Sequence, residues 1–356
     1  RDNQNEAPEN LLKTYLDLCL KARIGTPNQQ KKPLLPYKKG SLLFAPMEGI
    51  TDPAYRKSVM ELYPEWDMFA TDFLRIPTEG HLTPNRIIEH MGSEIYEDQK
   101  LRDKTTFQIL TTPKANTLQA LEVISSLEIN HLDLNIGCPS RRVNAHLGGS
   151  YLLSDIKLLE NVVSLIRKNF KKCFTVKIRA GYKDDLLFED ILKTLEDCGV
   201  EAITIHGRTR VDMYKGIARW EYFKRATNLV KVPIISNGDI WTPEDIEKVF
   251  NETNCYAIMC ARSAMKTPWL ARSFQEYLRD QKNEQTNRLQ KRVESLPTYF
   301  STLENNYRLQ KLDNSKILKK FKALIRYSYD DFEDGELLKR QMLRSQELAE
   351  FKQVSL

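Results

Sequence analysis

The chain has 356 residues, of which 41% are hydrophobic and 29% charged, with a formal net charge of +6. This composition is typical of a soluble globular protein, and no apolar run approaches the roughly 20 residues that a bilayer span requires. The length fits an α/β barrel of roughly 250 residues with a smaller appendage. The six cysteines form no CxxC pair and no framework spacing, which favours a reduced, cytoplasmic protein without a metal site.

Residues 1–40 are predicted to be an N-terminal extension and linker. The segment 11–23 has an amphipathic pattern, so we expect a helix that docks on the main body. The Pro-, Gln- and Lys-rich run that follows is typical of a linker.

Short β-prone runs recur from residue 42 to residue 262 and alternate with stretches of helical periodicity. Strands that alternate with helices pair in parallel through crossover connections, and such strands are apolar nearly throughout because both faces are buried. Helices are expected at 155–168, 186–198 and 243–250. The expected strands lie within 42–47, 68–73, 105–110, 131–137, 174–181, 202–208, 232–240 and 257–262. Eight such units predict an α/β fold, a (β/α)8 TIM barrel over residues 41–273.

Residues that could take part in binding or chemistry stand at the end of every predicted strand. In a barrel of this kind the loops at the C-terminal ends of the strands converge on one mouth, where the chemistry collects. These side chains therefore predict a single site. From the first strand to the eighth they are Pro46, Met47 and Glu48; Asp72 and Arg75; Gln108; Asn135 and Cys138; Lys177 and Arg179; His206 and Arg208; Asn237, Gly238 and Asp239; and Ala261 and Arg262.

The stretch 132–151 is the centre of this arrangement. It begins as a buried strand and breaks at Gly137 into a polar loop, which places the thiol of Cys138 at the mouth. The amide of Asn135 lies close to it and suits recognition of a small polar ring. Cys138 could equally be a buried structural cysteine, since free Cys is among the most buried residue types.

Two further groups at the mouth carry charge. Lys177 and Arg179 lie two apart on one strand and so share a face, where they would repel one another unless an anionic or electron-rich group lies near them. The alternative is a pair of structural cations, and His206 could be a satisfied core histidine. The loops after the last two strands of barrel enzymes frequently hold a phosphate, a task that the Gly238-Asp239 turn and the guanidinium of Arg262 fit.

Beyond residue 274 the barrel pattern stops, and residues 274–356 are predicted to form a helical domain. In 316–326 the apolar residues share one face of a helix, and lysines, including Lys319 and Lys320, fall around the other. Such a face is usually only solvated; the alternative is contact with a nucleic-acid backbone.

Taken together, these motifs resemble the tRNA-dihydrouridine synthase family. The matching segments cover the whole barrel in order, and the helical C-terminal region corresponds to the family's RNA-binding domain. They are APMEGITD (45–52), FQI around Gln108, DLNIGCPSRRVNAHLGGSYLL (133–153), VKIRAG (176–181), IHGRTR (205–210) with Tyr214 downstream, ISNGDI (235–240) and ARSAM (261–265). Ala261 departs from the pattern, since the family usually has Gly there.

The resemblance implies an enzyme that reduces specific uridines in the D-loop of tRNA to 5,6-dihydrouridine, with FMN as cofactor and NADPH as reductant. Cys138 would protonate C5 of the base while reduced FMN gives a hydride to C6. Met47-Glu48-Gly49 together with 71–75 is similar to the subgroup that modifies position 16. The resemblance implies tRNA as the partner and no contact with a membrane, and we expect a monomer. The resemblance assigns Pro46, Met47, Glu48, Gln108, Lys177, His206, Asn237, Gly238, Asp239, Ala261 and Arg262 to the cofactor, and Arg75, Asn135, Arg179, Arg208, Tyr214, Lys319 and Lys320 to the base or tRNA.

The residues themselves leave two alternative functions open. One is an FMN barrel oxidoreductase that acts on a free pyrimidine or another small compound, which the cationic C-terminal helix disfavours. The other is a tRNA-binding protein whose barrel has lost catalysis, which the presence of Cys138, Lys177 and Arg179 disfavours.

Overall fold

Parallel strands close into a barrel in the computed structural model, which describes residues 35–280, 288–329 and 333–355. Every neighbouring pair of strands is parallel, and the pairings of β1 with β9 and of β2 with β4 complete the ring. The barrel strands are β1 (Ser41–Phe44), β2 (Met68–Ala70), β4 (Thr105–Leu110), β5 (His131–Ile136), β6 (Cys173–Arg179), β7 (Ala202–His206), β8 (Ile234–Asn237) and β9 (Ala257–Cys260). The predicted (β/α)8 barrel is confirmed, strand for strand. One short extra strand, β3 (Leu74–Arg75), pairs with the end of β4.

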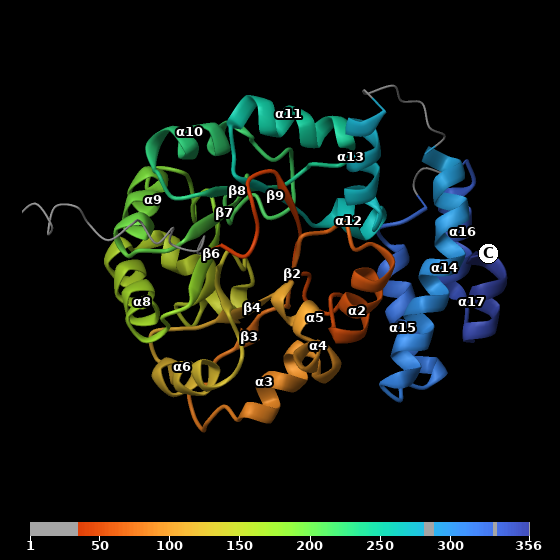
Figure 1. The fold of residues 1–356 in the computed structure, drawn as a ribbon, viewed down its shortest axis with the longest axis horizontal. Helices are drawn as coiled ribbons and strands as arrows, with labels where there is room; N and C mark the ends of the chain where they lie inside the picture. Colours follow the sequence, from red (N-terminus) through yellow and green to blue (C-terminus); the bar gives the residue numbers. More distant parts are fainter. Residues whose placement is uncertain (1–34, 281–287, 330–332, 356) are drawn as a thin grey trace, which may run out of the picture. The chain divides into compact units, whose positions relative to one another are not determined.

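The strands are buried on both faces, as their apolar sequences require. All six residues of β4 are buried, and β5 and β6 each have one residue that is only partly buried. The outward-facing residues pack under the surrounding helices in one large hydrophobic core. Figure 1 shows these helices arranged around the central strands.

The helices begin at residues that favour helix initiation. Asp52 accepts a hydrogen bond from the backbone N–H of Tyr55 and caps α2 (Pro53–Leu62), and Thr242 forms a capping box with Asp245 at the start of α11 (Pro243–Thr253). The helices expected at 155–168, 186–198 and 243–250 are α8 (Ile156–Asn169), α9 (Phe188–Asp197) and α11. The others around the barrel are α3 (Pro84–Met91), α4 (Ser93–Glu97), α5 (Gln99–Asp103), α6 (Thr117–Ser126), α7 (Arg141–Asn144), the 3-10 helix η1 (Gly149–Ser154), α10 (Glu221–Leu229) and α12 (Arg262–Lys266).

The end of the predicted linker covers the N-terminal end of the barrel. Leu35 and Tyr37 are buried and pack in a second core with inward-facing strand residues, among them Cys173 and Ala202 at the starts of their strands. The ring of Tyr37 lies 6.2 Å from the ring of His131 inside the barrel. The helix expected at 11–23 lies outside the described residues.

The C-terminal region is helical, as predicted. It contains α14 (Arg288–Leu309), α15 (Asn314–Ile325), α16 (Gly335–Arg344) and α17 (Leu348–Ser355), and α13 (Leu270–Arg279) runs across the expected boundary at 273. Figure 1 shows α14 to α17 grouped beside α2. Buried hydrogen bonds join α14 to α2, from Tyr299 to Tyr55 at 3.0 Å and from Asn306 to Ser58 at 2.9 Å.

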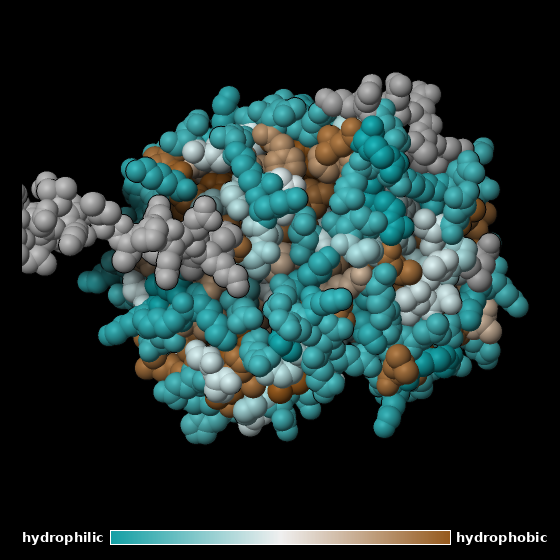
Figure 2. Space-filling view, viewed as in Figure 1, coloured by the Kyte–Doolittle hydropathy of each residue, from teal (hydrophilic) through white to brown (hydrophobic). Residues whose placement is uncertain are grey.

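The surface is mostly hydrophilic. Figure 2 shows hydrophobic residues in separate patches on the face in view. Among the helices of the described residues, none is both long and apolar enough to cross a membrane.

Candidate active site

A pocket with a volume of about 380 Å³ lies at the C-terminal ends of the strands. The end of each of the eight barrel strands, or the loop after it, contributes to the lining. The predicted site residues that line the pocket are Pro46, Met47, Glu48, Asp72, Gln108, Asn135, Cys138, Lys177, Arg179, His206, Tyr214, Asn237, Gly238, Asp239, Ala261 and Arg262. The structure thus brings together residues that lie up to 216 positions apart in the sequence, from Pro46 to Arg262.

Four predicted residues lie outside the lining. Arg75 is exposed on β3, and Lys319 and Lys320 are on α15. Arg208 is only 1% exposed and donates to the backbone oxygens of Lys215 and Gly216. This geometry favours a structural role for Arg208, in place of the expected contact with the base or tRNA.

A clamp of hydrogen bonds holds the loop that carries Cys138. The backbone carbonyl oxygen of Cys138 accepts hydrogen bonds from the backbone N–H of Ser150 at 3.2 Å, from the Ser150 hydroxyl at 2.8 Å and from the Asn144 amide at 3.3 Å. Gly149 has a φ of +57°, and a Cβ added there would lie 3.1 Å from the same oxygen. Ser150 and Asn144 were not among the predicted site residues, because a hydroxyl and an amide in a polar loop give no signal of what they contact.

The environment of Cys138 favours the protonated form of its thiol. Burial raises its pKa, the backbone N–H of Ser140 lowers it, Glu48 raises it, and Arg75 and Arg179 lower it. Together these effects raise the pKa of Cys138. A proton donor needs this state, although the cationic surroundings alone would have favoured a thiolate.

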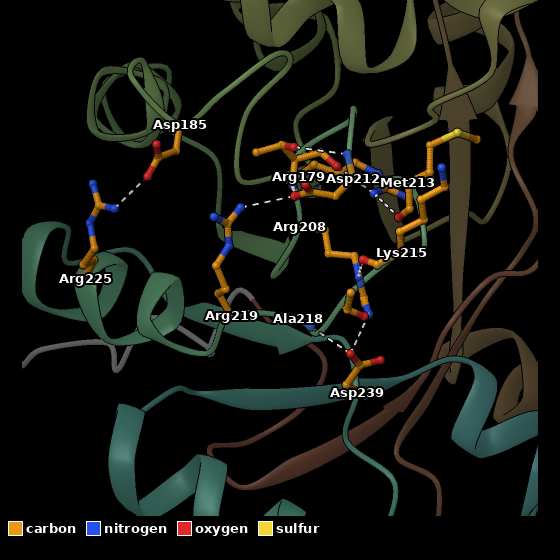
Figure 3. Close-up of polar contacts among 12 residues, drawn as sticks. Arg179, Asp185, Arg208, Asp212, Met213, Lys215, Ala218, Arg219, Arg225 and Asp239 are labelled. Carbon is orange, nitrogen blue, oxygen red and sulfur yellow. Dashed lines mark hydrogen bonds and ion pairs between the residues drawn. The ribbon is translucent and has the colours of Figure 1, made fainter.

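The two cations on β6 have different environments. Arg179 donates to the carbonyl oxygens of Gly137 at 2.9 Å, of Thr209 at 3.0 Å and of Met213 at 2.7 Å. Figure 3 shows the contact with Met213. The Arg179 guanidinium therefore ties the Cys138 loop to the loop after β7. Burial and the neighbouring Arg179 lower the pKa of Lys177 to about 8.

The carboxylate of Asp239 organises the turn after β8. It accepts from the guanidinium of Arg208 at 2.6 Å and from the backbone N–H of Ala218 at 2.7 Å, as Figure 3 shows, and from Arg262 at 2.7 Å. The Arg262 guanidinium lies 5.7 Å from the centre of the Tyr214 ring and 5.4 Å from that of Trp241. Ala261 has a φ of −110°, so its Cβ is accommodated where a glycine had been expected.

This part of the pocket fits an anionic ligand. The ring nitrogen Nδ1 of His206 is buried and has no hydrogen-bond partner in the described part of the chain. Burial lowers the pKa of His206 well below its usual value, and Lys177, Arg179, Arg208 and Arg262 add to this effect. A phosphate would meet this cluster of cations with one carboxylate among them.

Polar side chains continue below the pocket into the barrel. The amide of Asn135 donates to Gln108 at 2.8 Å, and the amide of Gln108 donates to Asp133 at 2.8 Å. No role was predicted for Asp133, because within β5 it follows the alternating pattern of any strand. Across residues 35–280, 288–329 and 333–355, no group of three or more His, Cys, Asp or Glu side chains could hold a metal ion.

The fold and the pocket define a parallel barrel with a thiol and a group of cationic side chains at one mouth. The family model described as dihydrouridine synthase matches residues 43–356, and the chain belongs to this family of enzymes.

Curated relatives agree with this assignment. The chain is 33% identical over 235 residues to a tRNA-dihydrouridine(16) synthase of Pseudomonas syringae pv. tomato, covering 65% of this chain and 73% of the relative. It is 31% identical over 258 residues to tRNA-dihydrouridine synthase B of Shewanella oneidensis, covering 68% of this chain and 74% of the relative. The chain matches both kinds of relative at similar identity. The degree of identity therefore does not show whether this protein acts at position 16 of the tRNA.

Among solved structures, a 2-naphthoyl-CoA reductase complex is similar in fold. It has a TM-score of 0.50 and 12% identity, and the match covers 67% of this chain and 50% of that chain.

Proposed function

We propose that this protein reduces uridine in the D-loop of tRNA to 5,6-dihydrouridine, with FMN as cofactor and NADPH as reductant. The observation that carries the proposal is a clamped, protonated thiol, Cys138, on the same pocket as a cluster of cations. The family assignment supports the reaction, and the curated relatives are named as tRNA-dihydrouridine synthases.

The residues present fit FMN. The unpaired Nδ1 of His206 and the cations near it suit the phosphate, together with the backbone of the Asn237-Gly238-Asp239 turn and of Ala261 and Arg262. Gln108 and Lys177 would meet the ring, and Pro46, Met47 and Glu48 would line it. When bound, reduced FMN supplies a hydride.

The chain's own residues supply the rest of the chemistry. Cys138 holds the proton that C5 of the uracil receives, and Lys177 and Arg179 stabilise negative charge that develops on the base. Asn135 and Tyr214 hold the base in the pocket. A uracil can reach this pocket only after it leaves its stack in the tRNA, so the base must be extruded.

The remaining contacts belong to the tRNA. Arg75 lies near Cys138 and would contact the nucleotides beside the extruded base, and the cationic face of α15 would contact phosphates. Met47-Glu48-Gly49 and residues 71–75 are similar to the subgroup that modifies position 16, which supports that position as the target uridine. We infer that the protein acts as a monomer in the cytoplasm.

The test is to map dihydrouridine, position by position, in tRNA from a synthase-deficient strain after incubation with the protein, NADPH and FMN. We expect dihydrouridine at one D-loop position. The matched control is Cys138→Ala, which should keep yellow FMN and tRNA affinity and lose most turnover. If the protein is yellow and oxidises NADPH but forms no dihydrouridine, a flavoenzyme acting on a small substrate becomes the better conclusion.

A further inference from the structure

A continuous chain of hydrogen bonds runs through the interior of the barrel to the pocket. Its centre is Asp133, which is 5% exposed. The carboxylate accepts from the Thr175 hydroxyl at 2.6 Å on one side and from the Gln108 amide at 2.8 Å on the other. The strand register sets both contacts, because Asp133 lies opposite Gln108 on β4 and opposite Thr175 on β6.

The pocket side of this chain has a fixed direction. The backbone N–H of Gly137 can only donate, and it donates to Oδ1 of Asn135 at 3.0 Å, so Nδ2 of Asn135 must point to Oε1 of Gln108. Nε2 of Gln108 must then point to Asp133. Both amide oxygens thus already accept a bond, while each amide nitrogen has one hydrogen left.

The other side of the chain can reverse. The ring of His131 lies between the hydroxyls of Thr106 and Thr175, at 2.9 Å from each. When Asp133 is ionised, Thr175 donates to it and accepts from His131. When Asp133 carries a proton, it can donate to Thr175, and the histidine changes tautomer. The Gln108 side is the same in both states, because an amide nitrogen cannot accept.

We propose that Asp133 is a positioning residue that keeps the free amide N–H groups of Gln108 and Asn135 directed at the pocket, where that of Gln108 recognises a ring carbonyl oxygen of the flavin and that of Asn135 meets the base. This inference rests on the proposed function. It goes beyond that function because Asp133 itself does not line the pocket. Its effect on the cofactor passes through Gln108.

Two substitutions at position 133 separate the effect of the Gln108 amide orientation on FMN binding from the effect of the negative charge of Asp133. Asp133→Asn removes the negative charge but can still accept from Gln108 through its oxygen while its nitrogen donates to Thr175. Asp133→Leu has nearly the same shape and removes the acceptor, so Nε2 of Gln108 loses its partner and the amide is free to turn. Both variants remove the charge near Lys177, so a difference between them reports on orientation alone.

Thr175→Val is the matched structural control. It removes the hydroxyl on the other side of Asp133 and leaves the contact to Gln108 in place. If the network only stabilised the barrel, this variant would impair the pocket as much as Asp133→Leu does.

The measurement is a titration of flavin-free protein with FMN, followed by flavin fluorescence and the visible absorption band, with thermal unfolding to confirm that each variant is folded. Because the Gln108 amide is no longer held in the orientation that FMN needs, we expect Asp133→Leu to weaken FMN binding by about tenfold or more. Its absorption band should also move, whereas Asp133→Asn and Thr175→Val should stay within about threefold of the wild type.

The outcomes separate the two proposals. Wild-type FMN affinity and spectrum in a folded Asp133→Leu would overturn the positioning role, as would equal losses in Asp133→Leu and Thr175→Val. A wild-type protein that binds no FMN would overturn the proposed function and the positioning role with it. If Asp133→Leu does not fold, the smaller Asp133→Val takes its place with the same expected result.

Discussion

At the residue scale, burial raises the pKa of Cys138, and nearby charges of opposite sign adjust it. Glu48 raises its pKa and Arg75 lowers it. Glu48→Gln should therefore lower the pKa of Cys138, and Arg75→Gln should raise it. The pKa can be measured from the pH dependence of alkylation by iodoacetamide, with Cys138→Ala subtracted to remove the other thiols. Shifts of both variants in the same direction would contradict the assignment.

The same thiol gives turnover a predictable pH dependence. The proton donor is active while protonated, and burial places its pKa above the usual thiol value. Turnover limited by this step should be highest near neutral pH and fall in two stages as the pH rises, first as Lys177 loses its charge near its pKa of about 8 and then through the raised pKa of Cys138. In Glu48→Gln the second fall should begin at lower pH. Single-turnover rates of uridine reduction between neutral and alkaline pH check this, and an identical profile in Arg75→Gln and Glu48→Gln would exclude Cys138 as the titrating group.

At the element scale, buried hydrogen bonds join the barrel helix α2 to the C-terminal helix α14. The amide of Asn306 donates to Ser58 at 2.9 Å and to Glu61 at 3.0 Å. Asn306→Ala leaves both groups without this donor, so we expect a loss of about 1–3 kcal/mol in the free energy of unfolding. Urea unfolding of the wild type and of Asn306→Ala measures this loss in the free energy of unfolding.

The neighbouring Asn305 provides the control for this prediction. It is exposed on the same helix, so Asn305→Ala should change stability by no more than about 0.5 kcal/mol, in the stabilising direction because alanine favours helix. Equal effects of the two variants would mean that the α2–α14 contact contributes nothing specific.

The barrel could be predicted from the sequence because its strands carry a strong local signal. Runs such as 105–110 and 131–137 are apolar and short, helical patterns separate them, and the polar residues stand where each strand ends. Parallel strands bring those residues to one mouth, which is why strand-end position alone was enough to group Cys138, Lys177 and Arg262 in one site.

Contacts that depend on register and loop path could not be predicted. Asp133 meets Gln108 and Thr175 only because β4, β5 and β6 pair in one particular register. Arg208 lies two residues after the end of β7, yet its side chain pairs with Asp239 and does not itself line the pocket. Strand-end position predicts proximity to the mouth, but the loop decides what each side chain contacts.

At the scale of the whole molecule, the cationic face of α15 is smaller than its sequence indicates. Lys320 forms an ion pair with Asp52 at 2.7 Å, and Lys322 donates to the carbonyl oxygen of Ser345 at 2.6 Å. Lys316 lies 3.6 Å from Asp313. Lys319 and Arg326 are exposed, and neither has an ion-pair partner among the residues that the structure describes. The charge available to a nucleic acid in this segment is therefore concentrated at these two residues.

This distribution separates the roles of two adjacent lysines in tRNA binding. Each phosphate contact contributes roughly 0.7–0.9 to the slope of log affinity against log salt concentration. Lys319→Gln should reduce the slope by about that amount. Lys320→Gln should change it less, because Asp52 already compensates its charge. Filter binding of unmodified tRNA over a series of KCl concentrations measures both slopes. Equal reductions would show that the ion pair with Asp52 opens on binding, and no reduction in Lys319→Gln would place the RNA surface away from α15.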